Sequence, residues 1–176
     1  MQISSRIRER IRDVKDFPTE GILFKDITPL FSDPGLCRDI IDHMAAMYSG
    51  EKPSAIAAME SRGFIFGPQL ARALDVPFIP VRKKGKLPYQ TISHSYDLEY
   101  GSAILEMHTD ALQPGDKIII HDDLLATGGT ADAAAELIKQ LKGEVMGFSF
   151  LIDLTFLGGK AKLLKHSSRV DSLVEY

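Results

Sequence analysis

One pattern constrains the fold of this chain more than any other: short apolar runs alternate with stretches of helical periodicity. The clearest run, residues 117–120, is followed by a polar loop and then by residues 131–141, whose apolar positions fall on one helical face. Residues 54–59 and 67–74 repeat the pattern. Strands that alternate with helices of this length form βαβ units. We therefore expect an α/β fold with a mainly parallel central sheet flanked by helices.

Further helices and strands complete this outline. Residues 3–14 carry apolar side chains at helical spacing, and a second helix should open at Asp33 and close near Gly50. The remaining candidate strands are residues 76–81, 104–107 and 145–154. A chain of 176 residues can bury one sizeable core, so we expect residues 1–176 to form a single domain.

Charge and cysteine content narrow the partners and the cellular compartment. The 21 Lys plus Arg residues against 24 Asp plus Glu give a net charge of −3, so no basic excess favours nucleic-acid binding. Cys37 is the single cysteine and can form no internal disulfide, which favours a reducing cytoplasm. Residues 1–16 lack the apolar run of a signal peptide, and no segment reaches membrane-spanning length. We expect a cytoplasmic protein without nucleic-acid or membrane partners.

Residues 83–100 fit neither the helical nor the strand period. This segment is rich in Lys, Ser, Tyr, Pro and Gly. Ordinary connections in compact domains have a median length of about 4 to 6 residues, so a structureless stretch of this length is either disordered or functional. We expect a flexible lid loop that is mobile without ligand and ordered when ligands bind.

The strongest chemical signal lies in residues 121–130, between the clearest strand and the helix that follows it. At this position in an open α/β sheet, ligands bind beyond the carboxyl ends of the strands. Gly128 and Gly129 carry no side chains that would keep backbone N–H groups from an anion, and the next helix offers its positive dipole end. Thr127 and Thr130 add hydroxyl donors. This loop therefore predicts a phosphate site.

Two carboxylates precede the predicted phosphate site. Asp122 and Asp123 are expected at the surface end of the strand, where they would repel phosphate but accept hydrogen bonds from sugar hydroxyls. Loop and acids together predict a sugar-phosphate ligand. The chain contains neither G-x-x-x-x-G-K-[ST] nor G-x-G-x-x-G, which argues against an ATPase or a dinucleotide-dependent oxidoreductase.

Cationic residues follow two other predicted strands. Arg62 follows residues 54–59, and Arg82 begins a run that includes Lys83 and Lys86. Arginine can contact phosphate through two donors at once, whereas lysine acts as a mobile point charge. Either cluster alone is more often a solubilising surface feature, but beside a sugar-phosphate loop the two predict a clamp for further phosphate charge.

The acidic pair, two apolar residues and Ala-Thr-Gly-Gly-Thr together resemble the binding motif for 5-phosphoribosyl 1-pyrophosphate (PRPP) in type I phosphoribosyltransferases. His121 departs from that motif, which has an apolar residue at the end of the strand. The resemblance implies a type I phosphoribosyltransferase fold with an N-terminal hood and a lid at about residues 83–100. It also implies that Asp122 and Asp123 hold the ribose hydroxyls. The 5-phosphate would lie on Ala126, Thr127, Gly128, Gly129 and Thr130.

Further segments extend the resemblance over nearly the whole chain. Residues 17–29, 60–67, 82–88 and 95–101 are similar, in the same order, to segments of the adenine phosphoribosyltransferase family. This resemblance implies a homodimer and roles for individual residues. Pyrophosphate would be bound by Ser61, Arg62, Lys83 and Lys86, with Arg82 reaching the neighbouring subunit, and the base would be bound by Leu23, Phe24, Lys25 and Leu154.

The implied activity is purine salvage, in which adenine and PRPP give AMP and pyrophosphate. Arg62 and Arg82 would stabilise the leaving pyrophosphate, Glu99 would be the general acid/base, and Mg²⁺ would be held mainly by PRPP rather than by an all-protein metal site. Two alternatives stay open. One is a transferase for 6-oxopurines such as hypoxanthine or xanthine, and the other is a non-catalytic PRPP-binding purine regulator.

Overall fold

The computed structural model describes residues 2–97 and 102–176. Its helices are α1 (Ile3–Arg10), η1 (Thr28–Ser32), α2 (Pro34–Tyr48), α3 (Gly63–Leu74), α4 (Gly129–Gln140), η2 (Thr155–Leu157) and α5 (Gly159–Leu163). Its strands are β1 (Arg12–Lys15), β2 (Leu23–Asp26), β3 (Ala55–Met59), β4 (Phe78–Lys83), β5 (Thr91–Asp97), β6 (Ser102–His108), β7 (Lys117–Leu125), β8 (Glu144–Asp153) and β9 (Val170–Glu175). The expected alternation of strands and helices is confirmed.

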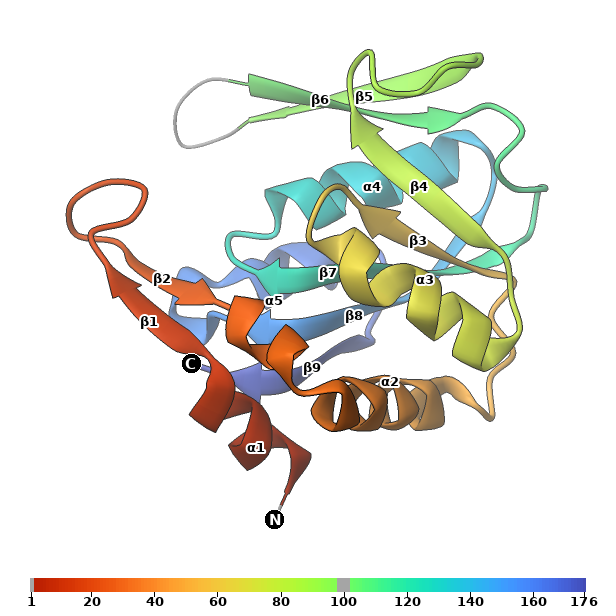
Figure 1. Ribbon diagram of the computed structural model, residues 1–176. Coiled ribbons are helices and arrows are strands. Elements are labelled where there is room, and N and C mark those ends of the chain that lie inside the picture. Colours follow the sequence, from red (N-terminus) through yellow and green to blue (C-terminus); the bar gives the residue numbers. More distant parts are fainter. Residues whose placement is uncertain (1, 98–101) are drawn as a thin grey trace.

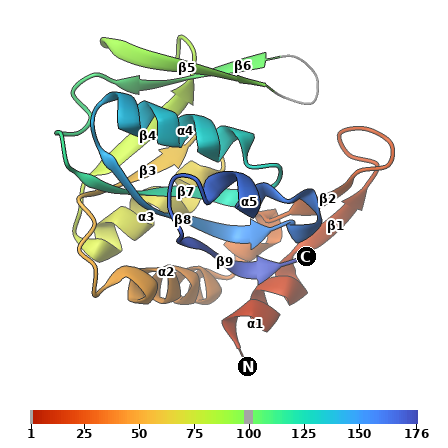
Figure 2. The same ribbon diagram turned by 180° about the vertical axis from the view of Figure 1, so that it is seen from behind.

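A seven-stranded sheet in the order β5-β6-β4-β3-β7-β8-β9 forms the centre of the molecule. The neighbouring strands β4, β3, β7, β8 and β9 pair in parallel, whereas β6 pairs antiparallel with both β4 and β5. Helices α4 and α5 cover one face, and α1, α2 and α3 cover the other (Figures 1 and 2). The predicted α/β fold with a mainly parallel sheet is therefore confirmed.

Burial on both faces explains why the central strands are uniformly apolar. Every residue of β3 is buried, and Ile118, Ile119 and Ile120 of β7 are fully buried between the two helical layers. Parallel strands covered on both faces read as continuous apolar runs. Helix α2 starts where the sequence predicts, because the Asp33 carboxylate accepts a hydrogen bond from the Leu36 N–H at 2.9 Å.

The N-terminal segment differs from its prediction. The expected helix over residues 3–14 ends at Arg10, and Val14 lies instead in β1, opposite Phe24 of β2. The β1–β2 hairpin forms a separate two-stranded sheet, seen in red and orange in Figure 1. Its strands are joined by side chains as well as backbone, since Arg12 pairs with Asp26 at 2.6 Å. These long-range pairs outweigh the local helical preference of residues 11–14.

The segment over residues 83–100 also differs from its prediction. A turn follows β4, and residues 91–97 form β5, which pairs with β6 from Thr91 opposite His108 to Asp97 opposite Ser102. Polar residues on both faces of the strand hide its period, but Ile92 and Tyr96 pack against the core. The expectation of a structureless loop is thus wrong for residues 91–97. Movement of this segment on ligand binding stays a prediction.

None of the helices in the described ranges is both long and apolar enough to cross a membrane.

Candidate active site

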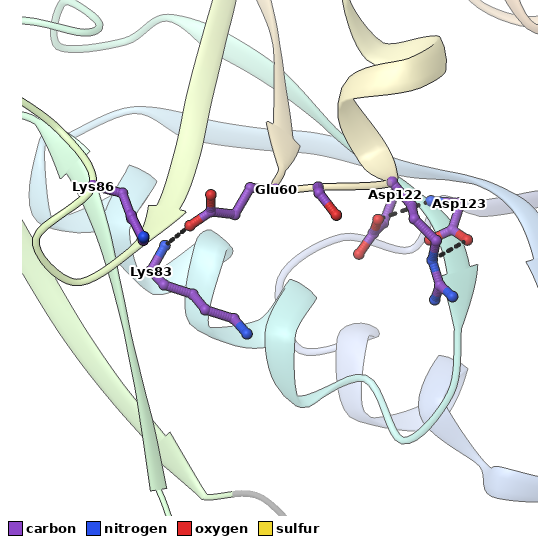
Figure 3. Close-up of a pocket in the computed structure, with 7 residues that line it drawn as sticks. Glu60, Lys83, Lys86, Asp122 and Asp123 are labelled. Carbon is purple, nitrogen blue, oxygen red and sulfur yellow. Dashed lines mark hydrogen bonds and ion pairs between the residues drawn. The ribbon is translucent and has the colours of Figure 1, made fainter. Parts of the chain in front are cut away.

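The main cleft lies at the carboxyl edge of the parallel strands. The loops after β3, β4 and β7 meet there, as expected for ligand sites in open α/β sheets. The cleft has a volume of about 520 Å³, and Figure 3 shows its cationic and anionic side chains facing one another. It is lined by Glu60, Ser61, Arg62, Lys83, Lys86, Asp122 and Asp123. The structure therefore brings together both acids of the predicted sugar site and four of the predicted pyrophosphate-binding residues.

The predicted phosphate loop adjoins this cleft. Strand β7 ends at Leu125, and α4 begins at Gly129. Gly128 has φ +81, a left-handed conformation that turns the chain directly into the helix. A small hollow of about 80 Å³ opens here, and its walls include Asp122 together with all five predicted loop residues, Ala126, Thr127, Gly128, Gly129 and Thr130. Loop and acids thus belong to one continuous site.

Helix α5 supports the phosphate loop from behind. The backbone of Gly159 lies so close to the loop that a Cβ atom there would stand 2.2 Å from the Ala126 carbonyl oxygen. It would also stand 3.0 Å from the Gly128 nitrogen. Residue 159 can therefore have no side chain unless the loop moves. The sequence alone does not reveal this role, because nothing local marks a glycine 31 positions after Gly128 as part of the loop.

The acidic pair is placed more deeply than expected. Strand β7 continues through Asp122 and Asp123, so the acids lie within the strand rather than at its surface end. Asp123 is only 2% exposed, and its Oδ2 pairs with Arg62 Nε at 2.8 Å. The Asp122 carboxylate accepts a hydrogen bond from the Asp123 N–H at 2.9 Å. The expectation of a solvent-facing pair is wrong, because β8 extends alongside β7 as far as Asp153.

Burial changes the acid strength of both groups. It raises the pKa of Asp122 well above its ordinary value, and the negative charge of Asp123 adds to that rise. Burial also raises the pKa of Asp123, against the opposing effect of Arg62. Additional hydrogen-bond donors would stabilise the ionised form of carboxylates that are removed from water in this way. The hydroxyl groups of a sugar would supply such donors.

Arg82 lies beside the cleft but is held by Glu60. Its Nε and Nη2 donate to the same Glu60 oxygen at 3.0 and 2.9 Å, and its Nη1 donates to the Lys86 carbonyl at 2.8 Å. Glu60 also accepts the Lys83 N–H at 2.6 Å. Burial opposes ionisation of Glu60, but these donors outweigh it and hold its pKa below the ordinary value. In this chain Arg82 shapes the turn that carries the two lysines rather than lining the cleft.

A second, largely apolar hollow of about 430 Å³ lies next to the first. Phe17 and Phe24 of the N-terminal segment meet edge to face, with ring centroids 5.0 Å apart. The hollow is lined by Val14, Phe17, Phe24, Asp26, Ile27, Thr28, Phe31, Arg62 and Ile65. A flat, mainly apolar ligand with polar edges fits such a lining.

Of the four predicted base-binding residues, Phe24 lines the apolar hollow. Lys25 is on the opposite face of β2, where its Nζ donates to Asp13 at 2.7 Å and lies 3.9 Å from the Tyr176 ring centroid. Leu23 is 47% exposed, and Leu154 follows β8 with its N–H donating to the Leu125 carbonyl. The side chains of these three residues do not line the hollow.

Most of the lining was not predicted from the sequence, including Val14, Phe17, Phe31 and Ile65. One signal was present, since Val14 would share a face with Phe24 if the two segments were read as a hairpin. Phe17 lies in the connection between β1 and β2, Phe31 in η1 and Ile65 in α3, and only the tertiary structure brings them together.

Arg62 connects the two hollows. It lines both of them, pairs with Asp123 on one side, and places its guanidinium 5.2 Å from the Phe24 ring centroid on the other. Apolar pocket, cationic cleft and phosphate loop therefore form one row along the edge of the sheet. Glu99, the predicted acid/base, lies outside the described residues.

A potential metal-ligand set lies away from this row. Within the described ranges, Asp132, Glu136 and His166 bring three ligand atoms within 4.8 Å of one another. The His166 ring is buried and its Nε2 is 2.6 Å from Asp132, while Lys165 Nζ is 2.7 Å from the same carboxylate. Lys165 pairs with Asp132 and Lys139 lies 4.0 Å from Glu136, so lysines of the chain itself already supply positive charge to this cluster. It borders α4 and α5 rather than the cleft.

The sequence has close relatives of known class. The phosphoribosyl transferase domain family matches residues 32–174. An adenine phosphoribosyltransferase of Cytophaga hutchinsonii is 52% identical over 174 residues, which cover 99% of this chain and 96% of the relative. One from Roseobacter denitrificans is 50% identical over 170 residues, which cover 97% of each chain.

Solved structures agree with the sequence comparison. The crystal structure of adenine phosphoribosyltransferase from Thermoanaerobacter pseudethanolicus has a TM-score of 0.94 at 47% identity, covering 98% of this chain and 99% of its own. The Saccharomyces cerevisiae enzyme, crystallised with an imino-altritol bisphosphate and adenine, has a TM-score of 0.91 at 41% identity, covering 97% and 98%. Similarity over the full length in both sequence and structure shows that the chain belongs to the phosphoribosyl transferase family and, within it, to the adenine phosphoribosyltransferases.

Proposed function

We propose that the protein joins adenine to the ribose 5-phosphate of PRPP, giving AMP and pyrophosphate in purine salvage. The observation that carries this proposal is the continuous row formed by the apolar pocket, the cationic cleft with its acid pair and the phosphate loop. Base, pentose with pyrophosphate, and 5-phosphate require these three environments in this order. The full-length relatives named as adenine phosphoribosyltransferases support the same activity.

PRPP is assigned to the cleft and the phosphate loop. The 5-phosphate lies on residues 126–130, where backbone N–H groups and the N-terminus of α4 favour an anion. The ribose hydroxyls donate to Asp122 and Asp123. Pyrophosphate lies against the Ser61–Arg62 turn and the two lysines of the β4–β5 turn.

Adenine is assigned to the apolar hollow, where the Phe24 ring offers a flat face. Among residues 2–97 and 102–176, strand β2 pairs only with β1, so its other edge offers backbone groups that can read the edge of the base. Leu23 and Lys25 would contribute through backbone atoms, because their side chains lie elsewhere. Relatives have been crystallised with adenine and, in Giardia lamblia, with 9-deazaadenine.

The reaction is a displacement at the anomeric carbon of PRPP. Adenine N9 forms the new bond to C1′, while the bond from C1′ to the pyrophosphate oxygen breaks and its electron pair leaves with pyrophosphate. Arg62 and the two lysines stabilise the negative charge that develops on the leaving group. Closure of the lid over the cleft would limit attack by water. Adenine must lose one ring proton, and Glu99 is our candidate acceptor.

Mg²⁺ is proposed as the cofactor. The described part of the cleft holds the carboxylates of Glu60, Asp122 and Asp123, but these three do not converge as a metal-ligand group, and we propose that the ion is held mainly by PRPP oxygens and water. When bound, the ion would neutralise charge on the pyrophosphate group.

Assembly and location complete the proposal. We propose a homodimer in which Arg82 exchanges Glu60 for contacts in the neighbouring subunit's active site. A cytoplasmic location is consistent with the single cysteine, Cys37.

The deciding experiment is a substrate panel. Purified protein with PRPP and Mg²⁺ is incubated with adenine, hypoxanthine, guanine, xanthine, orotate or uracil, and nucleotide and pyrophosphate are measured. We expect adenine to be the best base by a wide margin. Comparable turnover of hypoxanthine would overturn the assignment of the base. Binding of PRPP without pyrophosphate release from any base would indicate a regulator instead of an enzyme.

A further inference from the structure

A tyrosine outside the cleft contacts the phosphate loop. The Thr130 hydroxyl donates a hydrogen bond to the Tyr96 phenol oxygen, with 3.3 Å between the two oxygens. Thr130 is the last residue of the predicted loop, and Tyr96 is on β5, far away in the sequence. The contact is partly buried, so it is shielded from competing water.

The packing of β5 on α4 explains how Tyr96 reaches this position. Figure 1 shows the β5–β6 pair lying across α4. Ile92, His94 and Tyr96 are two residues apart along β5 and therefore lie on the same face of the strand. His94 Nδ1 lies 3.4 Å from Gln140 Nε2, at the opposite end of α4 from Thr130. The Tyr96 ring packs against the core cluster under α4, which fixes the direction of its hydroxyl. The phenol is therefore held at the N-terminus of the phosphate-binding helix.

The chemistry of the two hydroxyls suggests a role. A threonine hydroxyl has one proton and can donate to only one acceptor at a time. Without ligand, Thr130 donates that proton to Tyr96. A phosphate in the loop is a stronger acceptor, since it is charged. The phenol keeps its own proton and can then donate to the Thr130 oxygen, and donors linked in such a chain strengthen one another.

We propose that Tyr96 is a positioning residue for the 5-phosphate of PRPP, acting through Thr130. In the complex the Tyr96 O–H donates to Thr130 Oγ1, and Thr130 donates to a phosphate oxygen. The proposal deepens the proposed function and rests on its placement of the 5-phosphate. This role for Tyr96 also explains why β5, one of the two antiparallel strands of the sheet, places a polar group on the phosphate loop, although an apolar side chain would suffice for packing.

The Tyr96→Phe variant tests this role, because it removes the phenol oxygen and keeps the ring. Kd values for PRPP and for ribose 5-phosphate are measured by calorimetry, together with KM for adenine. One hydrogen bond of ordinary strength predicts a rise in both Kd values of about 3- to 10-fold, with KM for adenine unchanged. Tyr89→Phe is the matched control, because Tyr89 is 60% exposed and faces His108 rather than the loop. It should leave every value unchanged.

A second variant assigns the effect to the Thr130 contact. Tyr96→Phe in a Thr130→Ala background should cause no further loss of PRPP affinity, because the partner hydroxyl is already absent. An equal loss in both backgrounds, or a loss that affects adenine as much as PRPP, would overturn the proposal. So would unchanged affinities in folded Tyr96→Phe protein. Failure of the wild-type protein to bind ribose 5-phosphate would instead count against the proposed function itself.

Discussion

Replacing Gly159 with alanine tests how the phosphate loop keeps its shape. The new Cβ would stand 2.2 Å from the Ala126 carbonyl oxygen, whereas carbon and oxygen atoms in proteins approach to about 3.3 Å. About 1 Å of overlap must therefore be relieved by movement. Helix α5 cannot easily retreat, because its Leu163 side chain is fully buried in the core. The loop backbone at residues 126–128 should move instead, away from the position in which its N–H groups converge.

The size of the effect follows from this displacement. Overpacking by one methyl group lowers the free energy of unfolding by about 1 to 3 kcal/mol. We expect Gly159→Ala to fall toward the lower end of that range, because the loop at residues 126–128 can move to relieve the overlap. For a domain of this size, that corresponds to a fall in Tm of about 2 to 6 °C. Loss of a single hydrogen bond to a charged group costs about 1.5 to 3 kcal/mol. PRPP affinity should therefore fall by about 10- to 100-fold, more than the modest loss of stability would suggest.

Calorimetric titration with PRPP and with ribose 5-phosphate, beside thermal unfolding, measures both effects. Gly50→Ala is the matched control, because no atom lies within 4 Å of its new Cβ and its φ lies outside the left-handed region. It should bind PRPP normally. Adenine affinity should be unaffected in both variants, since the apolar hollow is formed by other elements. A folded Gly159→Ala protein with wild-type PRPP affinity would refute the reasoning that α5 sets the loop geometry.

Four further variants test the remaining assignments. Asp122→Asn with Asp123→Asn should weaken PRPP binding about 10-fold or more in calorimetry, and unaltered affinity would remove the pair from the site. Glu60→Gln should loosen the lysine turn and raise KM for PRPP more than it lowers kcat, whereas an unchanged KM would contradict a positioning role. Glu99→Gln should lower kcat by about 10²- to 10⁴-fold in steady-state assays with PRPP affinity kept, and a near-normal kcat would show that Glu99 only positions the base or that adenine needs no protein proton acceptor. Burial lowers the pKa of His121 to about 4 from 6.5, so the unfolded chain takes up its proton first as pH falls. Stability should decline between these values, and in urea unfolding His121→Leu should flatten that decline; an unchanged pH profile would show that other groups cause it.

The sequence predicted those parts of the site that depend on local chemistry. Glycines, threonines and acids next to an apolar run define the phosphate loop, because parallel strands always place such segments at one edge of the sheet. The direction of Arg82 could not be predicted in this way. It depends on Glu60, which follows a different strand and competes with any ligand for the guanidinium group.

The apolar pocket was predicted least well, for a related reason. Its walls come from β1, β2, η1 and α3, and each apolar residue there could equally be ordinary core. Strand β5 was missed because His94 stands between Ile92 and Tyr96, where the alternation that marks a half-buried strand calls for an apolar residue. In both cases the deciding contacts are tertiary.

The position of Arg62 has a consequence for how the two substrates influence one another. Its guanidinium touches both the pyrophosphate cleft and the Phe24 ring, so a ligand in either hollow changes the surroundings of the other. PRPP that draws Arg62 from Asp123 would also alter the face that adenine stacks on. Such coupling is reciprocal by thermodynamic necessity: whatever factor PRPP adds to the affinity for adenine, adenine must add to the affinity for PRPP. If the two substrates bind as proposed, this one side chain would make each binding event depend on the other.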